Sequence, residues 1–147
     1  MIKHMQSGDM EAALGLYLEV FWAPPFSYGD WLTRDNARRY FADNERTPGG
    51  YTMLYYAADT LCGVCMGYTL DYFVVKTYDI KEFVVRLDVQ GLGHGSRMMQ
   101  EVQGHLQQHH GVQAITLTTQ SNMPAHKFYK KNGFRDLDKT IYMSKNI

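Results

Sequence analysis

The sequence contains no apolar run long enough to span a bilayer and no signal-peptide pattern, which favours a cytoplasmic protein without a membrane partner. A surplus of either charge is also missing. Fifteen Lys and Arg residues balance fifteen Asp and Glu residues, so no overall field attracts nucleic acid. Repeats, low-complexity tracts and linker-like stretches are absent as well. We therefore expect a single domain over residues 1–147, a length that allows a sizeable core.

Cysteine is scarce, and the only two residues form the segment CGVC, from Cys62 to Cys65. A structural zinc site needs four ligands, and no second cysteine pair is present. The surrounding TLCGVCMGYTL has the composition of a strand, which indicates two buried thiols rather than a redox pair at a helix start. His105, His109 and His110 lack the glutamate of the metalloprotease pattern, so we interpret them as structural or solvated residues near a helix end. We predict no metal site.

Apolar periodicity predicts two helices before the clearest strands. The first follows Ser7 or Asp9 as candidate caps, and an aromatic loop with two prolines separates it from the second. The predicted elements are helices over 7–22 and 33–45, a hairpin of strands over 51–58 and 61–70, a strand over 79–89, a helix over 96–110, a strand over 112–119, a helix over 122–134 and one or two strands in 135–147.

This order of elements predicts an α/β fold with a mixed sheet and helices on both faces. An antiparallel meander is expected to join a parallel pair near the segment EFVV, residues 82–85. Ligands tend to bind where a sheet changes in this way, so we expect the functional site there.

Three glycines alternate with other residues in the segment DVQGLGHGSRMM, between a predicted strand and a predicted helix. Unpaired backbone N–H groups at a helix start attract phosphate, and Gly91, Gly93 and Gly95 would let it approach the backbone. Ser96 and Arg97 could add donors. The segment is neither a P-loop nor a dinucleotide fingerprint. Taken alone, it indicates either a phosphate-binding loop or a tight strand-to-helix connection.

A second segment decides between these interpretations. The pattern Q-x-x-G-x-G at 90–95, followed by N-x-x-A-x-x-F-Y-x-x-x-G-F at 122–134, resembles the GNAT superfamily of acyl-CoA-dependent N-acyltransferases. The resemblance covers essentially the whole chain and implies the order β-α-α-β-β-β-α-β-α-β-β. It also implies acetyl-CoA as co-substrate, with its pyrophosphate held by the first motif. The implied loop contacts are Gln90, Gly91, Leu92, Gly93, His94, Gly95 and Ser96.

The resemblance also implies catalytic roles. Tyr129 occupies the family's tyrosine position and would donate a proton to the departing thiolate; otherwise it is a packed aromatic residue. Glu82 lies where many relatives place the glutamate that takes the amine proton, often through water. Its alternative is a surface or ion-paired carboxylate. An aliphatic amine is mostly protonated at neutral pH because its pKa is about 10, so such a base is needed.

Other cofactor contacts are carried over in the same way. A bulge in the family's strand frees main-chain groups, so Val84 and Val85 would contact the pantetheine and thioester, with the Val85 N–H facing the developing oxyanion. Asn122 is expected to cap its helix and contact the cofactor arm, and Phe128 is a further contact. The chain has RLDVQ before the glycine loop, where relatives commonly have a proline, so the path of the chain into the loop is open.

The acceptor is indicated by the aromatic residues of the early helices and strands, among them Trp22, Phe26, Tyr28, Trp31 and Tyr40. Most are expected in the core; any that line the pocket favour an amine with an apolar or aromatic body. The leading hypothesis is a small-molecule amine N-acetyltransferase. The alternatives are a protein or peptide N-acetyltransferase and a non-catalytic acyl-CoA-binding module. The resemblance also allows a homodimer.

Overall fold

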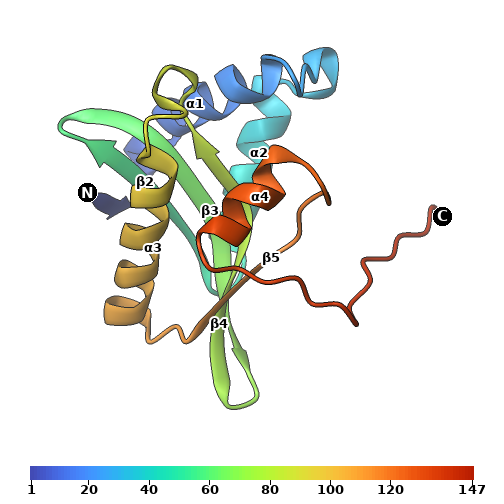
Figure 1. Ribbon diagram of the computed structural model, residues 1–147. Coiled ribbons are helices and arrows are strands. Elements are labelled where there is room, and N and C mark those ends of the chain that lie inside the picture. Colours follow the sequence, from blue (N-terminus) through green and yellow to red (C-terminus); the bar gives the residue numbers. More distant parts are fainter. The chain divides into compact units, whose positions relative to one another are not determined.

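A computed structural model describes all residues, 1–147, which fall into a first unit, Met1–Thr116, and a second unit, Leu117–Ile147 (Figure 1). Helices α1 and α2 are separated from α3 by an antiparallel meander, as the sequence predicts. None of the helices is long and apolar enough to cross a lipid bilayer. The elements are β1 Ile2–His4, α1 Met10–Trp22, α2 Arg34–Arg46, β2 Gly50–Ala57, β3 Thr60–Tyr72, β4 Val75–Val85, α3 His94–His110, β5 Ala114–Leu117 and α4 Pro124–Lys131, with short 3-10 turns at Ser7–Asp9, Gly29–Trp31 and Leu87–Val89.

The five strands form one sheet in the order β1-β2-β3-β4-β5. Strands β1 to β4 pair antiparallel. Strand β5 runs parallel to β4, because its contacts advance in the same direction: Gln113 N donates to Lys76 O at 2.8 Å and Thr116 Oγ1 donates to Asp79 Oδ1 at 2.6 Å. The expected mixed sheet, with its change from antiparallel to parallel pairing at β4, is confirmed.

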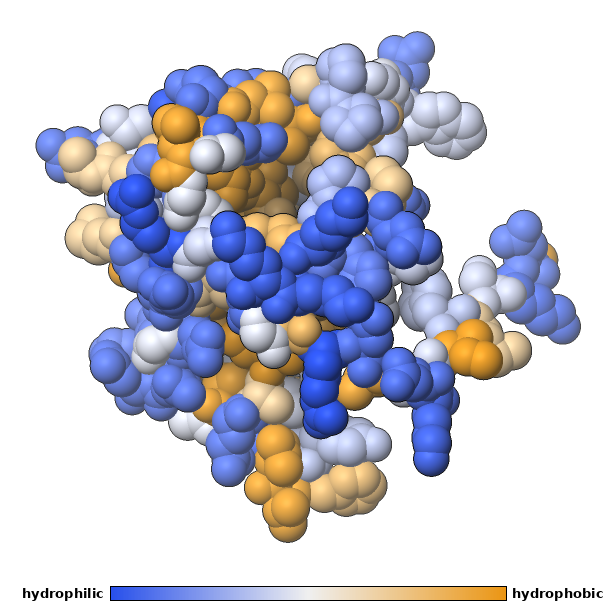
Figure 2. All heavy atoms as spheres, viewed as in Figure 1, coloured by the Kyte–Doolittle hydropathy of each residue, from blue (hydrophilic) through white to orange (hydrophobic).

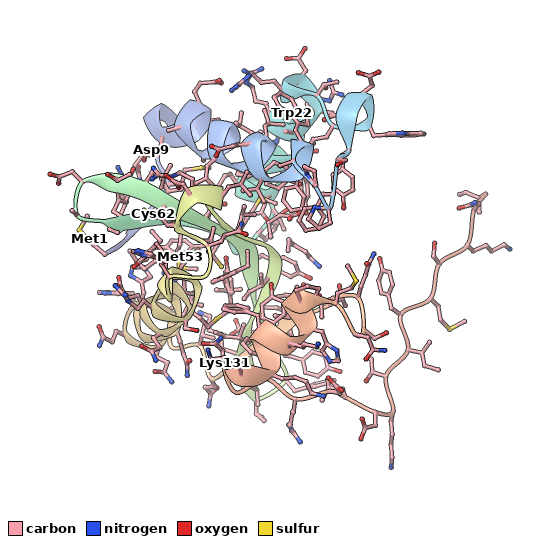
Figure 3. The ribbon with its side chains drawn as sticks, turned by 45° about the horizontal axis from the view of Figure 1, so that its top comes forward. Met1, Asp9, Trp22, Met53, Cys62 and Lys131 are labelled. Atoms are coloured by element: carbon pink, nitrogen blue, oxygen red, sulfur yellow. The ribbon has the colours of Figure 1, made fainter.

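Helices cover the two faces of this sheet (Figures 1 and 3). On one face, Leu14 of α1 and Phe41 of α2 pack in a cluster with Val64 and Met66 of β3. On the other face, α3 buries Met98 and three further apolar residues, and Met98 lies directly over Gly63 of β3. Because side chains alternate along a strand, β3 serves both layers of the core. We call these the α1/α2 face and the α3 face.

The local signals explain where most helices begin and end. Thr33 caps α2 by accepting a hydrogen bond from Asn36 N at 3.1 Å, while Asn36 accepts one from Thr33 N in return. Helix α3 ends at Gly111 in the left-handed conformation. Helix α1 begins after Asp9, whose carboxylate accepts hydrogen bonds from Gln6 N and Lys3 Nζ instead of capping α1.

Cys62 and Cys65 are both buried, unbonded thiols in β3, as expected. Burial raises the pKa of the Cys65 thiol to about 12, so it stays protonated and unreactive at neutral pH.

Three expectations are wrong. The strand expected over 79–89 is β4 at Val75–Val85, and residues 87–89 turn instead. Met123, not Asn122, is the N-cap of α4: Pro124 is the first helical residue and forces its predecessor to be extended, while Asn122 has a left-handed φ of 61°. Residues 135–147 form no strand. Their apolar side chains, such as Ile141 and Tyr142, are exposed, and a strand needs a paired neighbour and a buried face.

Candidate active site

A β-bulge determines which face of the sheet Glu82 occupies. Glu82 pairs with Met66 of β3, whereas Ile80 pairs with Gly67, so β4 contains one extra residue between them. In a regular strand Ile80 and Glu82 would share a face. The extra residue reverses the alternation, so that Ile80 lies on the α3 face with Gly67, and Glu82 lies on the α1/α2 face with Met66. This bulge between β3 and β4 is a feature that the sequence could not reveal.

Two tyrosines from different helices bind the Glu82 carboxylate. Tyr40 of α2 donates its hydroxyl to Glu82 Oε1 at 3.1 Å, and Tyr17 of α1 donates to the same oxygen at 3.4 Å. Tyr17 is buried and packs edge-on against Phe41, with ring centroids 5.2 Å apart, so its hydroxyl is held in place. Both donors use one oxygen, which leaves Oε2 for a substrate or water.

Burial dominates the electrostatics of this carboxylate. It raises the pKa of Glu82 to about 7, although the hydrogen bonds from Tyr40 and Tyr17 act in the opposite direction. Burial and the nearby carboxylate also raise the pKa values of both tyrosines well above their usual range, so they remain hydrogen-bond donors. No cation pairs with Glu82 in the first unit. A carboxyl that titrates near neutral pH suits a general base.

After Glu82, the main-chain N–H and C=O groups of successive residues point alternately toward β3 and away from it. Arg86 N donates to Cys62 O of β3 at 2.8 Å. Because alternate residues of an antiparallel pair bond to the same neighbour, Val84 also faces β3 with its main chain, and Val85 faces away from it. The side chain of Val84 is buried in the core, whereas the Val85 carbonyl accepts a hydrogen bond from Gln90 Nε2 at 2.8 Å. Gln90 therefore ties the start of the glycine loop to the end of β4.

The glycine loop presents backbone rather than side chains. Gly91 and Gly93 have φ values of 77° and 83°, and Gly93 is the N-cap of α3. A Cβ at Gly91 would meet no atom within 4 Å, so conformation rather than crowding requires glycine there. The first helical bond of α3 runs from Arg97 N to Gly93 O, which leaves the amides of His94, Gly95 and Ser96 without a helical acceptor. Unpaired N–H groups at a helix start suit a phosphate group.

The remaining predicted residues belong to the second unit. Tyr129 lies on α4, with its ring 5.3 Å from that of Phe128 and 5.5 Å from that of Phe134. Its carbonyl accepts the N–H groups of Asn132 and Phe134, which closes the helix. The Asn122 N–H donates to Nδ1 of His126, whose Nε2 is 2.7 Å from Asp136 Oδ1. These contacts order both ends of α4 around the motif found in the sequence.

Only some of the aromatic residues lie in the core, where most of them were expected. Phe41 and Tyr55 are buried, whereas Trp31 is 91% exposed. The tip of the β3–β4 hairpin carries exposed Phe73 and Val74, seen as the apolar tip at the bottom of Figure 2. This tip precedes β4, at the opposite end of that strand from Glu82, and is not part of the candidate site.

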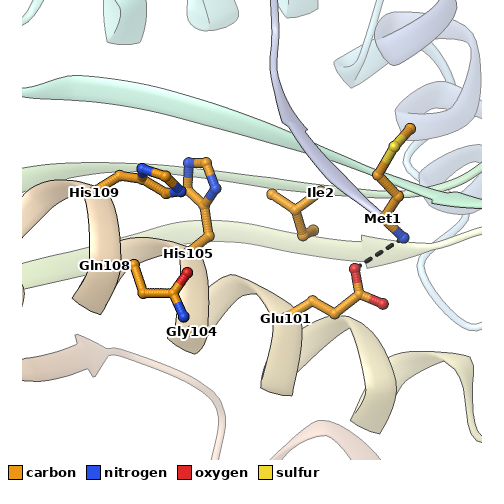
Figure 4. Close-up of a pocket in the computed structure, with 7 residues that line it drawn as sticks. All are labelled: Met1, Ile2, Glu101, Gly104, His105, Gln108 and His109. Atoms are coloured by element: carbon orange, nitrogen blue, oxygen red, sulfur yellow. Dashed lines mark ion pairs between the residues drawn. The ribbon is translucent and has the colours of Figure 1, made fainter.

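A pocket lies on the first unit beside α3. Figure 4 shows Glu101, His105 and His109 of α3 with Met1, whose amino group is 2.8 Å from Glu101 Oε2. His105 Nε2 lies 2.9 Å from the Tyr51 hydroxyl, and its pKa is lowered, mainly by burial. No group of three or more His, Cys, Asp or Glu residues in the structure is arranged to hold a metal. His105 and His110 pack against the Tyr51 ring.

The sequence analysis missed Tyr17 altogether and named Tyr40 only as one ring among many. Tyr17 and Tyr40 are 65 and 42 residues from Glu82 along the chain. The only available signal was that Tyr17 lies among apolar residues in an amphipathic helix, where a buried phenol needs a partner.

Comparison with known proteins gives an independent view of the chain. It matches the model of the acetyltransferase (GNAT) family over residues 16–134. No curated protein sequence matches it.

Among solved structures, a GNAT family acetyltransferase from Staphylococcus aureus is similar with a TM-score of 0.71 and 13% identity, covering 100% of this chain and 98% of that one. An aminoglycoside antibiotic 6'-N-acetyltransferase from Acinetobacter haemolyticus has a TM-score of 0.72 and 12% identity, with 100% and 99% covered. A transcriptional regulator from Bacillus halodurans has a TM-score of 0.73 and 18% identity, with 99% of each chain covered. At such low sequence identities, the structural similarity shows the fold alone. Since the family model itself spans most of the sequence, the chain belongs to the GNAT family of acetyltransferases and is an acyltransferase.

Proposed function

We propose that residues 1–147 act as one N-acetyltransferase domain that moves the acetyl group of acetyl-CoA directly to a primary amine of a small molecule. The observation that carries this proposal is Glu82, a partly buried carboxyl with a pKa of about 7. It lies on the strand that leads into the glycine loop and accepts hydrogen bonds from two tyrosines. A module that only binds acyl-CoA has no need of such a group. The family model, which spans both units, supports treating them as one domain.

Glu82 is the proposed base. The acceptor arrives as an ammonium ion, since its pKa is about 10, and Glu82 Oε2 takes one proton from nitrogen directly or through water. The nitrogen–carbon bond then forms and the carbon–sulfur bond breaks. The second proton that leaves nitrogen balances the proton gained by the thiolate. The Val85 N–H, which faces away from β3, is the proposed donor to the developing oxyanion.

Acetyl-CoA supplies the activated acetyl thioester when it is bound. The proposed pyrophosphate cradle is the run of amides from Gly91 to Ser96, with Gly93 at the N-cap of α3. Gln90 positions this loop through its bond to Val85 O. The proposed contacts beyond the loop are Val84, Val85, Asn122 and Phe128, which rest on the family resemblance.

Tyr129 is the proposed proton donor to the sulfur. Replacing it with Phe keeps the ring and removes the hydroxyl, so turnover should fall about tenfold or more while acetyl-CoA affinity is retained. Turnover is measured as acetyl-CoA-dependent thiol release, and affinity by calorimetry. Equal turnover in the variant and the wild type would show that the hydroxyl has no such role.

The first experiment is thiol release across aromatic amines, polyamines, aminoglycosides and N-terminal peptides, with Glu82→Gln beside the wild type. Turnover of a small amine that is lost in the variant would support the proposal. Turnover of peptides alone would replace it with a peptide acetyltransferase. Acetyl-CoA binding without turnover of any amine would indicate a binding module. Small molecules are favoured because two similar solved structures are aminoglycoside acetyltransferases.

A further inference from the structure

Three aromatic rings form a contiguous surface at the end of α1. The ring centroid of Phe21 lies 4.7 Å from that of Phe26 and 5.6 Å from that of Tyr28, and the Phe21 and Tyr28 rings are stacked at an interplanar angle of 3°. Phe26 and Tyr28 are also in contact, at 5.9 Å. We refer to Phe21, Phe26 and Tyr28 as the ring platform.

The ring platform connects to the Glu82 carboxylate through a single residue. Tyr17, one helical turn before Phe21, has its ring 4.7 Å from the Phe21 ring, and its hydroxyl donates to Glu82 Oε1. All of these residues belong to the first unit. Tyr17 thus contacts the ring platform through Phe21 and the carboxylate through its hydroxyl.

Two rings of the ring platform are not buried in the hydrophobic core. Phe26 is 42% exposed and Tyr28 is 44% exposed. The segment is nevertheless held in place: Tyr28 N donates to Phe21 O at 3.0 Å, and Trp22 Nε1 donates to Leu32 O at 2.7 Å. Figure 3 labels Trp22 at this end of α1. Ordered, partly exposed rings suit a flat apolar ligand.

Carboxylates that could hold a polycation are already engaged elsewhere. Glu11 binds Arg34 and Arg38, and Asp35 also binds Arg38 at 3.0 Å. Asp43 is paired with Arg46. Of the acids near the ring platform in sequence, Glu19 and Asp30 lie outside these ion pairs. This arrangement fits an acceptor with one ammonium group rather than several.

We propose that the ring platform selects arylalkylamines, that is, primary amines joined to an aromatic or similarly flat apolar body by a short alkyl spacer. This inference rests on the proposed transfer to a small-molecule amine. The body stacks on Phe26 and Tyr28, while the amine faces Glu82 Oε2. Phe21, Phe26 and Tyr28 thus determine specificity, and the chemistry at nitrogen is the same for any amine that reaches Glu82.

The test compares 2-phenylethylamine with propylamine, which has the same type of amine but no ring, and with the aminoglycoside kanamycin. We expect kcat/KM for 2-phenylethylamine to exceed that for propylamine about tenfold or more. Phe26→Ala and Tyr28→Ala should remove most of this preference. Tyr28→Phe, which keeps the ring, should retain it. Trp31→Ala is the matched control, because Trp31 lies on the same loop and is almost fully exposed.

Equal kcat/KM values for the two amines, or a preference for kanamycin, would overturn the inference and leave the proposed function standing. If no amine is acetylated although acetyl-CoA binds, the proposed function fails. Calorimetric titration of 2-phenylethylamine into the protein with coenzyme A then decides the inference separately. Binding that is lost in Tyr28→Ala and kept in Trp31→Ala would support it, and absence of binding to the wild type would overturn it.

Discussion

At the level of single residues, the environment of Glu82 explains its chemistry. A carboxyl with two phenol donors on one oxygen would ordinarily be a stronger acid, but burial outweighs both hydrogen bonds and raises its pKa to about 7. The group is therefore about half ionised at neutral pH. It can accept a proton from an ammonium ion and release it to solvent between turnovers.

This balance predicts a pH profile. Glu82→Gln should lower kcat/KM about a hundredfold or more and abolish the ascending limb near pH 7. Because kcat/KM reports the free enzyme and free acceptor, the limb due to Glu82 is separate from that of the amine near pH 10. The measurement is kcat/KM from pH 5 to 9. A limb near pH 7 that persists in the variant would assign the base to another group.

Removing the hydroxyl of Tyr17 or Tyr40 should shift the pH profile without removing the Glu82 carboxylate. Their hydrogen bonds lower the Glu82 pKa, so removing either hydroxyl should move the ascending limb to higher pH. Tyr40→Phe should produce the larger shift, because the Tyr40 bond is shorter than the Tyr17 bond. Limbs that stay at the wild-type position in both variants would show that the hydroxyls do not act on this carboxylate.

Some of these residues were predictable and some were not. Glu82 could be proposed from its spacing before the loop motif, because a strand and the turn after it are close in sequence. Its pKa and its partners Tyr17 and Tyr40 depend on how two helices pack over the sheet. No local pattern encodes which hydroxyl points at a carboxylate on a distant strand.

At the level of helices and strands, the structure differs from the sequence-based expectation at two features of the backbone: the bulge in β4 and the first turn of α4. The helices α2 and α3 were predictable because their apolar stripes and end signals agree. The bulge in β4 was not, because a register shift depends on the pairing with β3, which the sequence of one strand does not record. Asn122 is a good capping residue in general, yet the proline two positions later sets the first turn and moves the cap to Met123.

The strand pair next to the bulge predicts a steric effect. A Cβ at Gly67 would lie 2.2 Å from Asp79 O, a backbone atom that cannot move aside. Gly67→Ala should therefore lower the free energy of unfolding by about 1–3 kcal/mol, measured by urea denaturation. Gly15→Ala is the matched control: nothing lies within 4 Å of that Cβ, and alanine in a helix should stabilise by up to about 1 kcal/mol. Equal stability of both variants would contradict the close approach at Gly67.

The glycine loop predicts a separate effect on acetyl-CoA binding. Gly93→Val places a β-branched side chain at a φ of 83° beside the unpaired amides and should abolish acetyl-CoA binding measured by calorimetry. Gly111→Val imposes a similar strain at the other end of α3, where φ is 64°. It should lower stability alike and keep acetyl-CoA affinity. Unchanged affinity in Gly93→Val would remove the pyrophosphate role of the loop.

At the level of the whole molecule, Glu82 makes folding stability depend on pH. Its pKa is higher in the folded state than the usual 4.5, so the folded state binds the proton more tightly. Stability from this group is present below about pH 4.5 and is lost as pH rises through 7. The loss amounts to about 3 kcal/mol at pH 8.5, as the order of magnitude of the shift.

Comparing Glu82→Gln with the wild type isolates this contribution. The lowered pKa values of His105 and His110 act in the opposite direction, as their contribution is lost when pH falls below about 6.5. The difference in unfolding free energy between the two proteins should therefore grow between pH 5 and pH 8.5, in favour of the variant. A constant difference across this range would show that Glu82 is not buried in solution.

The fold of the whole chain was the easiest level to predict, since the order of elements and two spaced motifs pointed to the same family. The tail was the exception. Residues 135–147 have the composition of strands, and whether such a segment pairs depends on partners outside it.

The bulge in β4 has a consequence for how this strand tolerates change. The bulge reverses the alternation of side chains along the strand. Before it, Tyr78 and Ile80 lie on the α3 face, and after it, Glu82 and Val84 lie on the α1/α2 face. Deleting one residue here would do more than shorten the strand. It would exchange the surroundings of Glu82 and Phe83, sending the carboxylate into the wrong layer while the rest of the sheet kept its order. Point substitutions along β4 can be judged one at a time, but its length cannot vary without moving the base.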